Sequence, residues 1–326
     1  MTQTRPADQP KPQRLAVDFV TAPDGLPICV AETGNPTGPA ILLIHGFSQT
    51  YAVFKRQFES DLARDFRLVA MDTRGHGCTG KPLTADAYLD SKLWADDIAA
   101  VIAAKRLVRP VLVGWSAGGY WIADYVRHYG TDNVAGSVLA GSHGGMLPRP
   151  TDPASVERMR AMVAASANFS PDVEQAIAGG DAFVNVMGAT PLPDDIRRIM
   201  HAGTLMLPAY ARRLMSGRDM QHEDVITKFR SPVLFIIGDR DRIATPEQLR
   251  GLTCNSPARA FPCTGADRTL DVRGTAGALQ CRAARLRRGC AGGSRTLSPA
   301  RAASPQRPVR TRLEHAGPGQ GSQPAL

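Results

Sequence analysis

The feature that most constrains the fold of this chain is an apolar run that ends on a turn of small residues. Residues 110–113, Pro-Val-Leu-Val, are followed by Gly114-Trp115-Ser116-Ala117-Gly118-Gly119. Such a run is typical of a strand buried in a parallel sheet, and Gly-x-Ser-x-Gly suits a sharp turn from strand to helix. A glycine-serine turn without chemistry would carry the same letters. We take Ser116 as the candidate nucleophile, since this turn lifts its side chain above the sheet edge.

The residue after Ser116 adds a second element of chemistry. The Ala117 N–H lies at the predicted start of a helix, where an unpaired donor and the helix dipole both favour negative charge. We therefore expect this N–H to stabilise a developing oxyanion.

Strand and helix patterns alternate along residues 15–144 and predict an α/β fold. Residues 1–14 are rich in Pro and Gln and are expected to be disordered. The predicted strands are 15–21 and 26–33, which form a hairpin, and 41–44, 66–72, 110–115 and 134–140; the predicted helices are 91–105 and 117–129. This alternation implies a mostly parallel central sheet flanked by helices, with right-handed crossovers.

The pattern changes to short helices from 145 to 228, which we interpret as a helical cap over the strand ends. The predicted cap helices are 154–165, 171–187, 194–201 and 210–216. The residues expected to line a substrate pocket are Trp115, Phe183, Met187, Met206 and Tyr210. These side chains would look the same as ordinary core. A strand at 232–237 then returns the chain to the core domain, over residues 229–252.

Charge divides the chain into a neutral body and a basic tail. Residues 253–326 hold twelve Arg, no Lys and three acidic residues, a net +9 that equals the whole-chain charge of +9. A basic body that would indicate nucleic-acid binding is therefore absent. The six cysteines lack the spacing of a metal finger, so we expect no metal, and the chain shows neither a long apolar span nor a signal-peptide pattern. We expect a cytoplasmic protein that is not bound to a membrane.

Four motifs in one order resemble the α/β-hydrolase superfamily over residues 15–252. They are His45-Gly46-Phe47, the run Asp72-Thr73-Arg74-Gly75-His76-Gly77, the turn at Ser116, and Gly238-Asp239-Arg240-Asp241. The turn Gly-Trp-Ser-x-Gly-Gly is similar to that of the small bacterial branch of esterases and cofactor-free haloperoxidases.

The resemblance implies roles for several residues and no cofactor. It places the second oxyanion N–H on Phe47 and the carboxylate of a Ser-His-Asp triad on Asp241. Asp239 competes for the acid role, although a residue directly after a strand more often caps the turn. His45 could act as base, but in this fold it more often orders the oxyanion loop. His76 and His143 follow strands as well and could serve shape alone.

The histidine that should follow the acid is missing from its expected place. The only His after Asp241 is His315, 74 residues on, whereas the family spacing falls 27 residues on, at Arg268. Arg cannot accept a proton at neutral pH. A tail dominated by Arg, Ala, Gly, Pro and Cys is typical of GC-rich DNA read out of phase. Shifted forward by one nucleotide, the codons from Arg268 can spell Ala-His-Trp, so we predict a frameshift; the alternative is a natural Arg-rich extension that binds an acidic partner.

Three classes of function therefore remain to be weighed. The first is a serine hydrolase of small esters or lactones, with perhydrolysis by the same site as a variant. The second is a non-catalytic relative that binds a small ligand, which the lost histidine would support. A nucleic-acid-binding tail is disfavoured because Phe261 is the only aromatic residue beyond 252. An epoxide or haloalkane enzyme is disfavoured too, since those relatives carry Asp at the turn.

Overall fold

The structure is a computed structural model. It describes residues 14–149, 151–153, 156–157, 170–188, 190–238, 241, 248–250, 252 and 260–265. The chain divides into units 1–283 and 284–326, and every described residue lies in the first.

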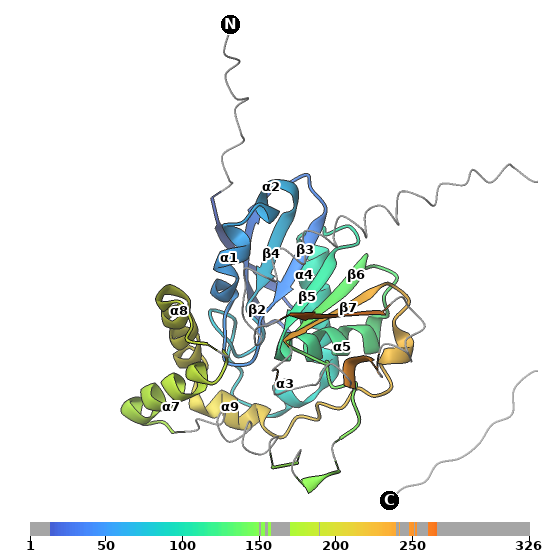
Figure 1. Cartoon of the computed structure of the whole chain (residues 1–326). Helices are drawn as coiled ribbons and strands as arrows, with labels where there is room; N and C mark the ends of the chain where they lie inside the picture. Colours follow the sequence, from blue (N-terminus) through green and yellow to red (C-terminus); the bar gives the residue numbers. More distant parts are fainter. Residues whose placement is uncertain are drawn as a thin grey trace, which may run out of the picture. The chain divides into compact units, whose positions relative to one another are not determined.

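One eight-stranded sheet organises this unit (Figure 1). The strands are β1 (Ala16–Thr21), β2 (Pro27–Gly34), β3 (Ala40–Ile44), β4 (Arg67–Met71), β5 (Val111–Trp115), β6 (Gly136–Ala140), β7 (Val233–Gly238) and β8 (Ala260–Gly265). Their order is β1-β2-β4-β3-β5-β6-β7-β8. β1 pairs antiparallel with β2 and β2 with β4, and the other neighbours pair parallel.

The strand order locates the place where a site is expected. From β3 the chain passes to β4 on one side and then to β5 on the other side, so the sheet reverses its direction of winding between β3 and β5. Ligands of open parallel sheets bind at the carboxyl ends of the strands at such a switch point. Residues 45–47 follow β3 and Ser116 follows β5, so both motifs meet there.

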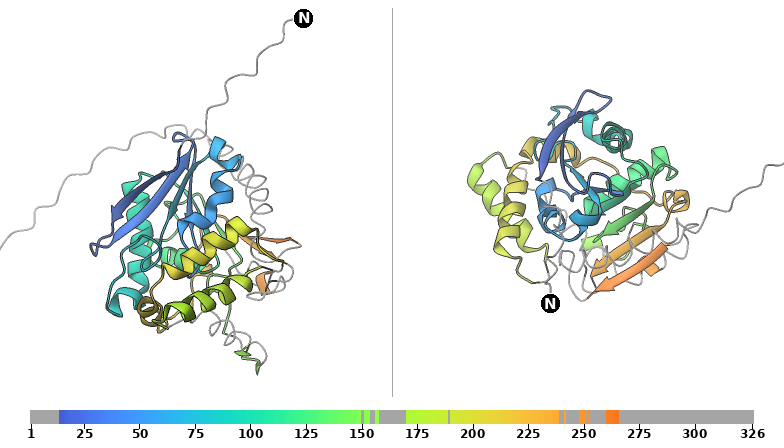
Figure 2. Two further views of the ribbon diagram at one scale, coloured as in Figure 1. Left: turned by 90° about the vertical axis from the view of Figure 1, so that its left-hand side faces the viewer. Right: turned by 90° about the horizontal axis from the view of Figure 1, so that it is seen from above.

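The helices cover the two faces of the sheet. They are α1 (Lys55–Phe58), α2 (Leu62–Asp65), α3 (Asp86–Leu89), α4 (Ser91–Ala104), α5 (Ala117–Tyr129), α7 (Val173–Asn185), α8 (Asp194–Leu205) and α9 (Ala209–Met215), with 3-10 turns η1 (Tyr51–Phe54) and η2 (Ile226–Lys228). Figure 1 shows α7, α8 and α9 grouped beside the strand layer, and both views of Figure 2 keep them together.

Strand alternation produces two separate cores. Leu42 and Ile44 of β3 point to the face that α4 and α5 cover, where Trp94 and Trp121 stack with ring centroids 4.1 Å apart. Ile41 and Leu43 point to the opposite face and pack with residues of η1, α2, α7 and α8. The cap helices α7 and α8 therefore share a hydrophobic core with this face of the sheet, whereas Ala211 and Met215 of α9 belong to the other core.

Most of the predicted elements are present. The hairpin, the strands after it, α4, α5 and the cap helices α7 to α9 lie within a few residues of their predicted bounds. The predicted helix 154–165 falls almost wholly outside the described residues. Within the described part, no helix is long and apolar enough to span a bilayer.

One boundary needs correction. The sequence pattern placed the end of the folded core at residue 252, but residues 260–265 form β8, which pairs parallel with β7 from Val233–Ala260 to Gly238–Gly265. The compositional change at residue 253 hid this strand, because Ala-Phe-Pro-Cys-Thr-Gly contains no clear run of β-branched residues. The sheet therefore extends at least to Gly265.

Candidate active site

Ser116 forms the turn between β5 and α5 at the carboxyl edge of the sheet. Its backbone has φ 52° and ψ −119°, a region that non-glycine residues rarely occupy. The Ser116 N–H donates to the Ala140 carbonyl of β6 at 2.9 Å, and its own carbonyl accepts from the Gly119 N–H at 3.0 Å. These bonds hold the strained residue in place, while its side chain stays partly exposed. A strained, exposed serine of this kind is the geometry of a nucleophile elbow.

Two glycines allow this turn by close backbone contact. A Cβ added to Gly114 would lie 2.5 Å from the Gly118 carbonyl, and one added to Gly118 would lie 2.2 Å from the Ile44 carbonyl of β3. Real Cβ atoms are not found so close to backbone, so any larger residue would force β5, α5 and β3 apart. The small residues around Ser116 thus have a packing reason as well as a conformational one.

The loop after β3 runs directly beside Ser116. A Cβ added to Gly46 would lie 3.0 Å from the Ser116 Cβ. The next residue is Phe47, and within the described part of the chain neither its N–H nor the Ala117 N–H donates to another backbone carbonyl. Among the described residues these two backbone donors have no acceptor in the loop and turn next to Ser116, and an oxyanion hole needs donors of this kind.

His45 is used to hold this loop. It is fully buried, its Nδ1 lies 2.7 Å from the Gly46 carbonyl, and its Nε2 lies 3.1 Å from the Thr73 N–H. We assign the neutral tautomer with hydrogen on Nδ1, because that form alone donates to the carbonyl and accepts from the N–H. Burial lowers the pKa of His45 to about 4, against a weaker opposing effect of the Gly46 hydrogen bond. Both ring nitrogens are occupied, so His45 anchors the loop that carries Phe47.

The other two histidines considered from the sequence are also built into the fold. His76 is fully buried beneath Phe47, with ring centroids 5.7 Å apart, and burial keeps its pKa well below the usual value. His143 lies with Nε2 3.1 Å from the Tyr120 hydroxyl, and its Nδ1 accepts from the Gly145 N–H at 3.2 Å. Burial, followed by the nearby His222, lowers the pKa of His143 to about 4.

The candidate acid follows β7. The Asp241 N–H donates to the Gly238 carbonyl at 3.2 Å, so the residue belongs to a tight turn at the carboxyl end of that strand. Asp239 lies outside the described residues. The choice between these two carboxylates therefore stays a prediction.

The position expected for the base lies just past the last strand. β8 ends at Gly265, three residues before Arg268, at the same sheet edge as Gly238. Arg268 and His315 both fall outside the described residues.

The expected pocket residues are distributed over two regions. Trp115 and Met187 pack into the same core as Val184 and Met200. Phe183 is half-buried on α7, whereas Tyr210 on α9 is 37% exposed and donates through its hydroxyl to the Lys81 carbonyl at 3.1 Å.

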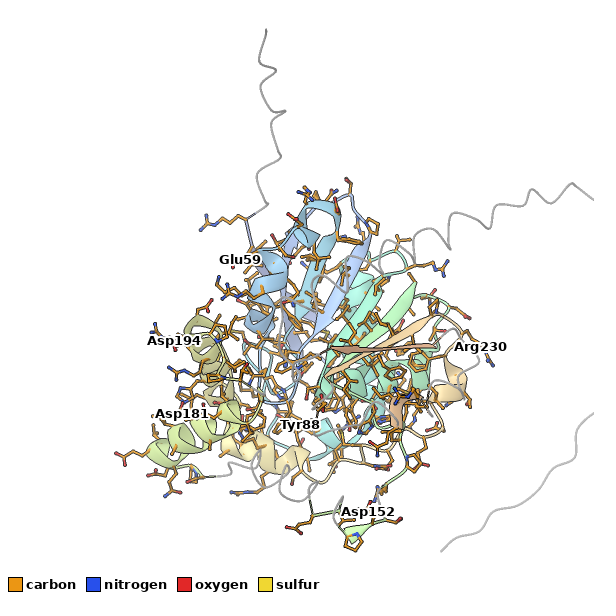
Figure 3. The ribbon with its side chains drawn as sticks, viewed as in Figure 1. Glu59, Tyr88, Asp152, Asp181, Asp194 and Arg230 are labelled. Carbon is orange, nitrogen blue, oxygen red and sulfur yellow. The ribbon has the colours of Figure 1, made fainter. Side chains whose placement is uncertain are left out.

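A cavity of about 420 Å³ lies between the ends of α7 and α8, which Figure 3 marks with Asp181 and Asp194. It is lined by Val184, Asn185, Gly188, Thr190, Pro191, Leu192, Asp194 and Arg197, and the expected pocket residues are not among them. Substrate contacts of the cap therefore stay a prediction.

Arg212 is a residue near the site that sequence reasoning missed. It projects from α9, is 5% exposed, and donates to the Ser48 hydroxyl at 2.5 Å and to the Thr204 carbonyl at 2.7 Å. Its guanidinium lies 5.5 Å from the Phe47 ring centroid, and burial lowers its pKa to about 10. Arg212 thereby connects α9 of the cap to the loop after β3. Arg-Arg in an amphipathic helix is usually solvent-exposed, so the sequence carried no signal for this contact.

A buried polar cluster behind α5 was also missed. Asp124 accepts from Arg218 and lies 2.8 Å from His222 Nε2, and all three side chains are nearly inaccessible to solvent. These residues are ordinary surface types in the sequence, and only the packing of 218–222 onto α5 brings them together.

In the described residues, one group has the atom types of a metal site. It consists of Cys29, Asp72 and Cys78, on β2, after β4 and in the following loop. No histidine joins this group.

A parallel sheet with a strained serine between its central strand and the next helix defines the class of α/β-fold hydrolases. A sequence-family model described as the alpha/beta hydrolase fold matches residues 39–172 of this chain.

Curated relatives and solved structures are similar to parts or most of this chain. The chain is 38% identical over 121 residues to EphD of Mycobacterium tuberculosis, which covers 36% of this chain and 20% of EphD. It is 36% identical over 121 residues to the bifunctional esterase/perhydrolase DCH of Acinetobacter calcoaceticus, covering 37% of this chain and 43% of DCH. The chain thus spans less than half the length of these curated relatives. The esterase RhEst1 from Rhodococcus sp. ECU1013 superposes with a TM-score of 0.71 and 28% identity, over 83% of this chain and 99% of RhEst1.

Proposed function

We propose that this protein is a serine hydrolase that cleaves small carboxylic esters through an acyl-enzyme. The observation that carries the proposal is the strained Ser116 beside two backbone N–H groups, of Phe47 and Ala117, that are free to donate. The names of DCH and RhEst1, both esterases, support the substrate class.

The chemistry follows from these positions. The Ser116 Oγ attacks the ester carbonyl carbon, and the Phe47 and Ala117 N–H groups donate to the oxyanion that forms. The C–O bond to the alcohol then breaks, and the alcohol leaves with a proton. Water attacks the acyl-enzyme, releases the carboxylic acid and restores the Ser116 hydroxyl.

A serine hydroxyl needs a base that takes its proton and a carboxylate that orients the base. We assign the carboxylate to Asp241, which follows β7. The base belongs at the turn after β8, where Arg268 now stands, and we infer that the reading frame shifts near this codon. A histidine read from the shifted frame at that position would follow β8 as Asp241 follows β7.

Two variants of the reaction use the same groups. Lactones are cyclic esters and pass through the same acyl-enzyme, in which the alcohol stays attached to the acyl group. In perhydrolysis a carboxylic acid acylates Ser116 with loss of water, and hydrogen peroxide then attacks the acyl-enzyme to give a peracid. The name of DCH, a bifunctional esterase/perhydrolase, supports this side activity.

Labelling of Ser116 by a fluorophosphonate, combined with hydrolysis of p-nitrophenyl acetate, tests the proposal. The gene is prepared as printed, with the frame restored from codon 268, and with Ser116→Ala in the restored frame. We expect the restored protein to be labelled at Ser116 and Ser116→Ala to lose roughly 10³-fold or more of kcat/KM. Ser91→Ala, whose hydroxyl contacts His128 at the surface, is the matched control and should keep full activity.

Two results would contradict the proposal. Retention of esterase activity within about tenfold by Ser116→Ala would remove the nucleophile. Absence of labelling in a folded, frame-restored protein would favour the alternative, a relative that binds a ligand without turnover.

The frame is tested by the chain as printed. We expect it to hydrolyse esters far more slowly than the restored protein, and resequencing codons 247–286 should find the shifted nucleotide. Full activity of the printed chain that is abolished by His315→Ala would instead make His315 the base.

A further inference from the structure

Two cysteines that are 49 positions apart in the sequence meet at the edge of β2. Cys29 is fully buried in β2 and Cys78 is exposed in the loop after β4. Their sulfur atoms and a carboxylate oxygen of Asp72 all lie within 4.8 Å of one another. The catalytic scheme above uses neither thiol.

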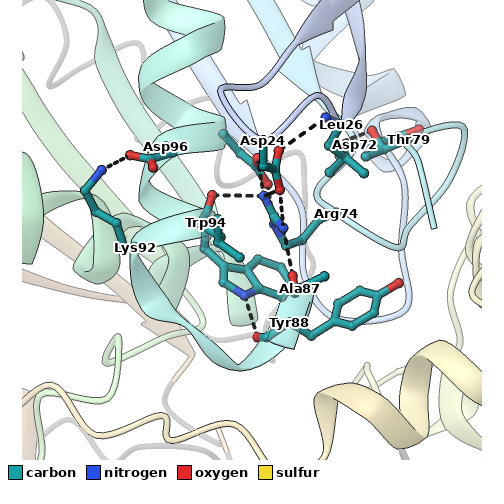
Figure 4. Close-up of polar contacts among 12 residues, drawn as sticks. Asp24, Leu26, Asp72, Arg74, Thr79, Ala87, Tyr88, Lys92, Trp94 and Asp96 are labelled. Atoms are coloured by element: carbon teal, nitrogen blue, oxygen red, sulfur yellow. Dashed lines mark hydrogen bonds and ion pairs between the residues drawn. The ribbon is translucent and has the colours of Figure 1, made fainter. Parts of the chain in front are cut away.

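The backbone around both cysteines fixes this proximity. The Cys29 N–H donates to the Thr79 hydroxyl at 2.9 Å, and the Cys29 carbonyl accepts from the Asp72 N–H at 2.9 Å. The Cys78 N–H donates to the Asp72 carboxylate at 2.8 Å, and Thr79 in turn donates to the Asp72 carbonyl at 2.6 Å (Figure 4). The same two residues, Asp72 and Thr79, therefore position both cysteines.

The loop that carries Cys78 is anchored further by Arg74. This buried guanidinium donates to both oxygens of Asp97 on α4, at 2.8 and 2.7 Å, and to Asp24 at 3.2 Å. Figure 4 shows Arg74 between Asp24 and the Ala87 carbonyl. Arg74 and Thr79 thus hold the loop on both sides of Cys78. The folded backbone therefore places the two sulfur atoms close together.

The geometry of Asp72 argues against a metal at this cluster. One carboxylate oxygen accepts from the Tyr51 N–H at 2.6 Å and the other from the Cys78 N–H. A Cβ added to Gly77 would lie 2.0 Å from Asp72 Oδ2, so backbone also covers this group. Structural zinc sites use four protein ligands, and here two thiols remain. A thiol pair without further ligands is suited to forming a disulfide.

The two thiols differ in access. Burial, followed by the Asp72 charge and the Cys78 thiol, raises the pKa of the Cys29 thiol to about 12. Cys29 is therefore poorly reactive toward a reagent in solution. Cys78 is exposed, and it is the thiol that an oxidant reaches first.

We propose that Cys29 and Cys78 form a reversible disulfide when the protein meets hydrogen peroxide or an alkyl hydroperoxide. The Cys78 thiol loses its proton, the thiolate attacks the terminal peroxide oxygen, the O–O bond breaks, and Cys78 becomes a sulfenic acid. The hydroxide or alkoxide that leaves takes up the proton, as water from hydrogen peroxide or as an alcohol from an alkyl hydroperoxide. The Cys29 sulfur then attacks the Cys78 sulfur, the S–O bond breaks, and the hydroxide released takes the Cys29 proton. In total the two sulfurs lose two electrons and the peroxide gains them. The products are two waters from hydrogen peroxide, or one water and one alcohol from an alkyl hydroperoxide.

The site is independent of the proposed esterase, because Ser116 takes no part in it. It would be a place of reversible modification next to the oxyanion loop, since the Thr73 N–H, directly after Asp72, donates to His45.

Peptide mapping of the full chain after peroxide treatment tests the proposal. The reduced protein and its Ser116→Ala variant are treated with hydrogen peroxide, alkylated and digested without reduction. In both we expect one linked peptide pair, containing Cys29 and Cys78, that dithiothreitol separates. In Cys29→Ser, which cannot close the bond, dimedone should trap the sulfenic acid at Cys78. In Cys78→Ser, Cys29 should stay reduced.

Three results would overturn the proposal. The first is that both thiols still react with the alkylating reagent after peroxide treatment. The second is that Cys78 forms disulfides only with cysteines beyond residue 252, such as Cys254 or Cys263. The third is that, after dialysis against zinc chloride, the parent protein retains one zinc per chain and Cys29→Ser retains none. The cluster would then be a metal site. Absence of esterase activity would not change the alkylation, the peptide linkage or the zinc content. The disulfide proposal and the esterase proposal are therefore tested independently.

Discussion

Replacing Arg74 by Met should destabilise the protein strongly without changing side-chain length much. Arg74 is fully buried and donates five hydrogen bonds within 2.7–3.2 Å to Asp97, Asp24 and the Ala87 and Leu93 carbonyls, counting one bond per partner oxygen. Removal leaves the Asp97 carboxylate, which is 0% exposed, without its counter-ion. Breaking one partner of such a buried pair costs about 3–5 kcal/mol.

That loss is large relative to a total stability of roughly 5–15 kcal/mol. We would measure it by urea unfolding at pH 7, followed by tryptophan fluorescence. Trp94 is a suitable probe because it stacks on Trp121 and lies 6.0 Å from the Arg74 guanidinium. Arg64→Met is the matched control: Arg64 is 53% exposed and pairs with Asp61 at 3.4 Å, so its loss should cost less than about 1 kcal/mol.

A second substitution tests the physical cause. If the cost comes from an uncompensated buried charge, Asp97→Leu added to Arg74→Met should restore part of the stability. The reasoning would be refuted if Arg74→Met lost less than about 1 kcal/mol of unfolding free energy while the slope of that free energy against urea concentration stayed the same.

Three further predictions concern the site. Burial lowers the pKa of His45 from 6.5 to about 4, so the stability it contributes is full above pH 6.5 and is lost as the pH falls through 4. In His45→Gln the fall in unfolding free energy over this window should be smaller by roughly 3 kcal/mol. His128→Gln should change this fall much less, because His128 is exposed and burial lowers its pKa only in part. Gly118→Ala should destabilise by about 1–3 kcal/mol and slow labelling of Ser116, because its Cβ would meet the Ile44 carbonyl at 2.2 Å, whereas Gly217→Ala meets nothing closer than 3.6 Å and should be silent in both measurements. Phe183→Ala should change relative rates among acyl chain lengths by roughly ten to a hundredfold if the cap selects substrate, while equal losses for all chain lengths, or the same change in exposed Val186→Ala, would count against this role.

The sequence predicted the central part of the fold because the signals there are local. The apolar run before Ser116, the alternation in the hairpin and the spacing of Ile98 and Val101 along α4 each lie within one element. They report the backbone conformation and the buried face directly. The same holds for Ser116, whose turn is set by the residues on either side of it.

Residues 260–265 show where this approach fails. Their segment has no clear strand pattern, and β8 is recognisable only from its pairing with β7. A strand at the margin of a sheet depends on its neighbour for hydrogen bonds, which no property of its own six residues reveals.

The roles of single residues were decided by the tertiary structure for the same reason. Whether His45 is a base or a loop anchor depends on the Thr73 N–H, which β4 brings to its Nε2 from 28 positions away. Arg212 reaches Ser48 across 164 positions, and Cys29 meets Cys78 because β2 and β4 pair in one register. The sequence alone determined the strands β1 to β7, the longer helices and the serine turn, since these depend on neighbouring residues. Contacts between side chains far apart in the sequence were decided only by the tertiary structure. They depend on strand register and on burial, and neither can be determined from a short segment alone.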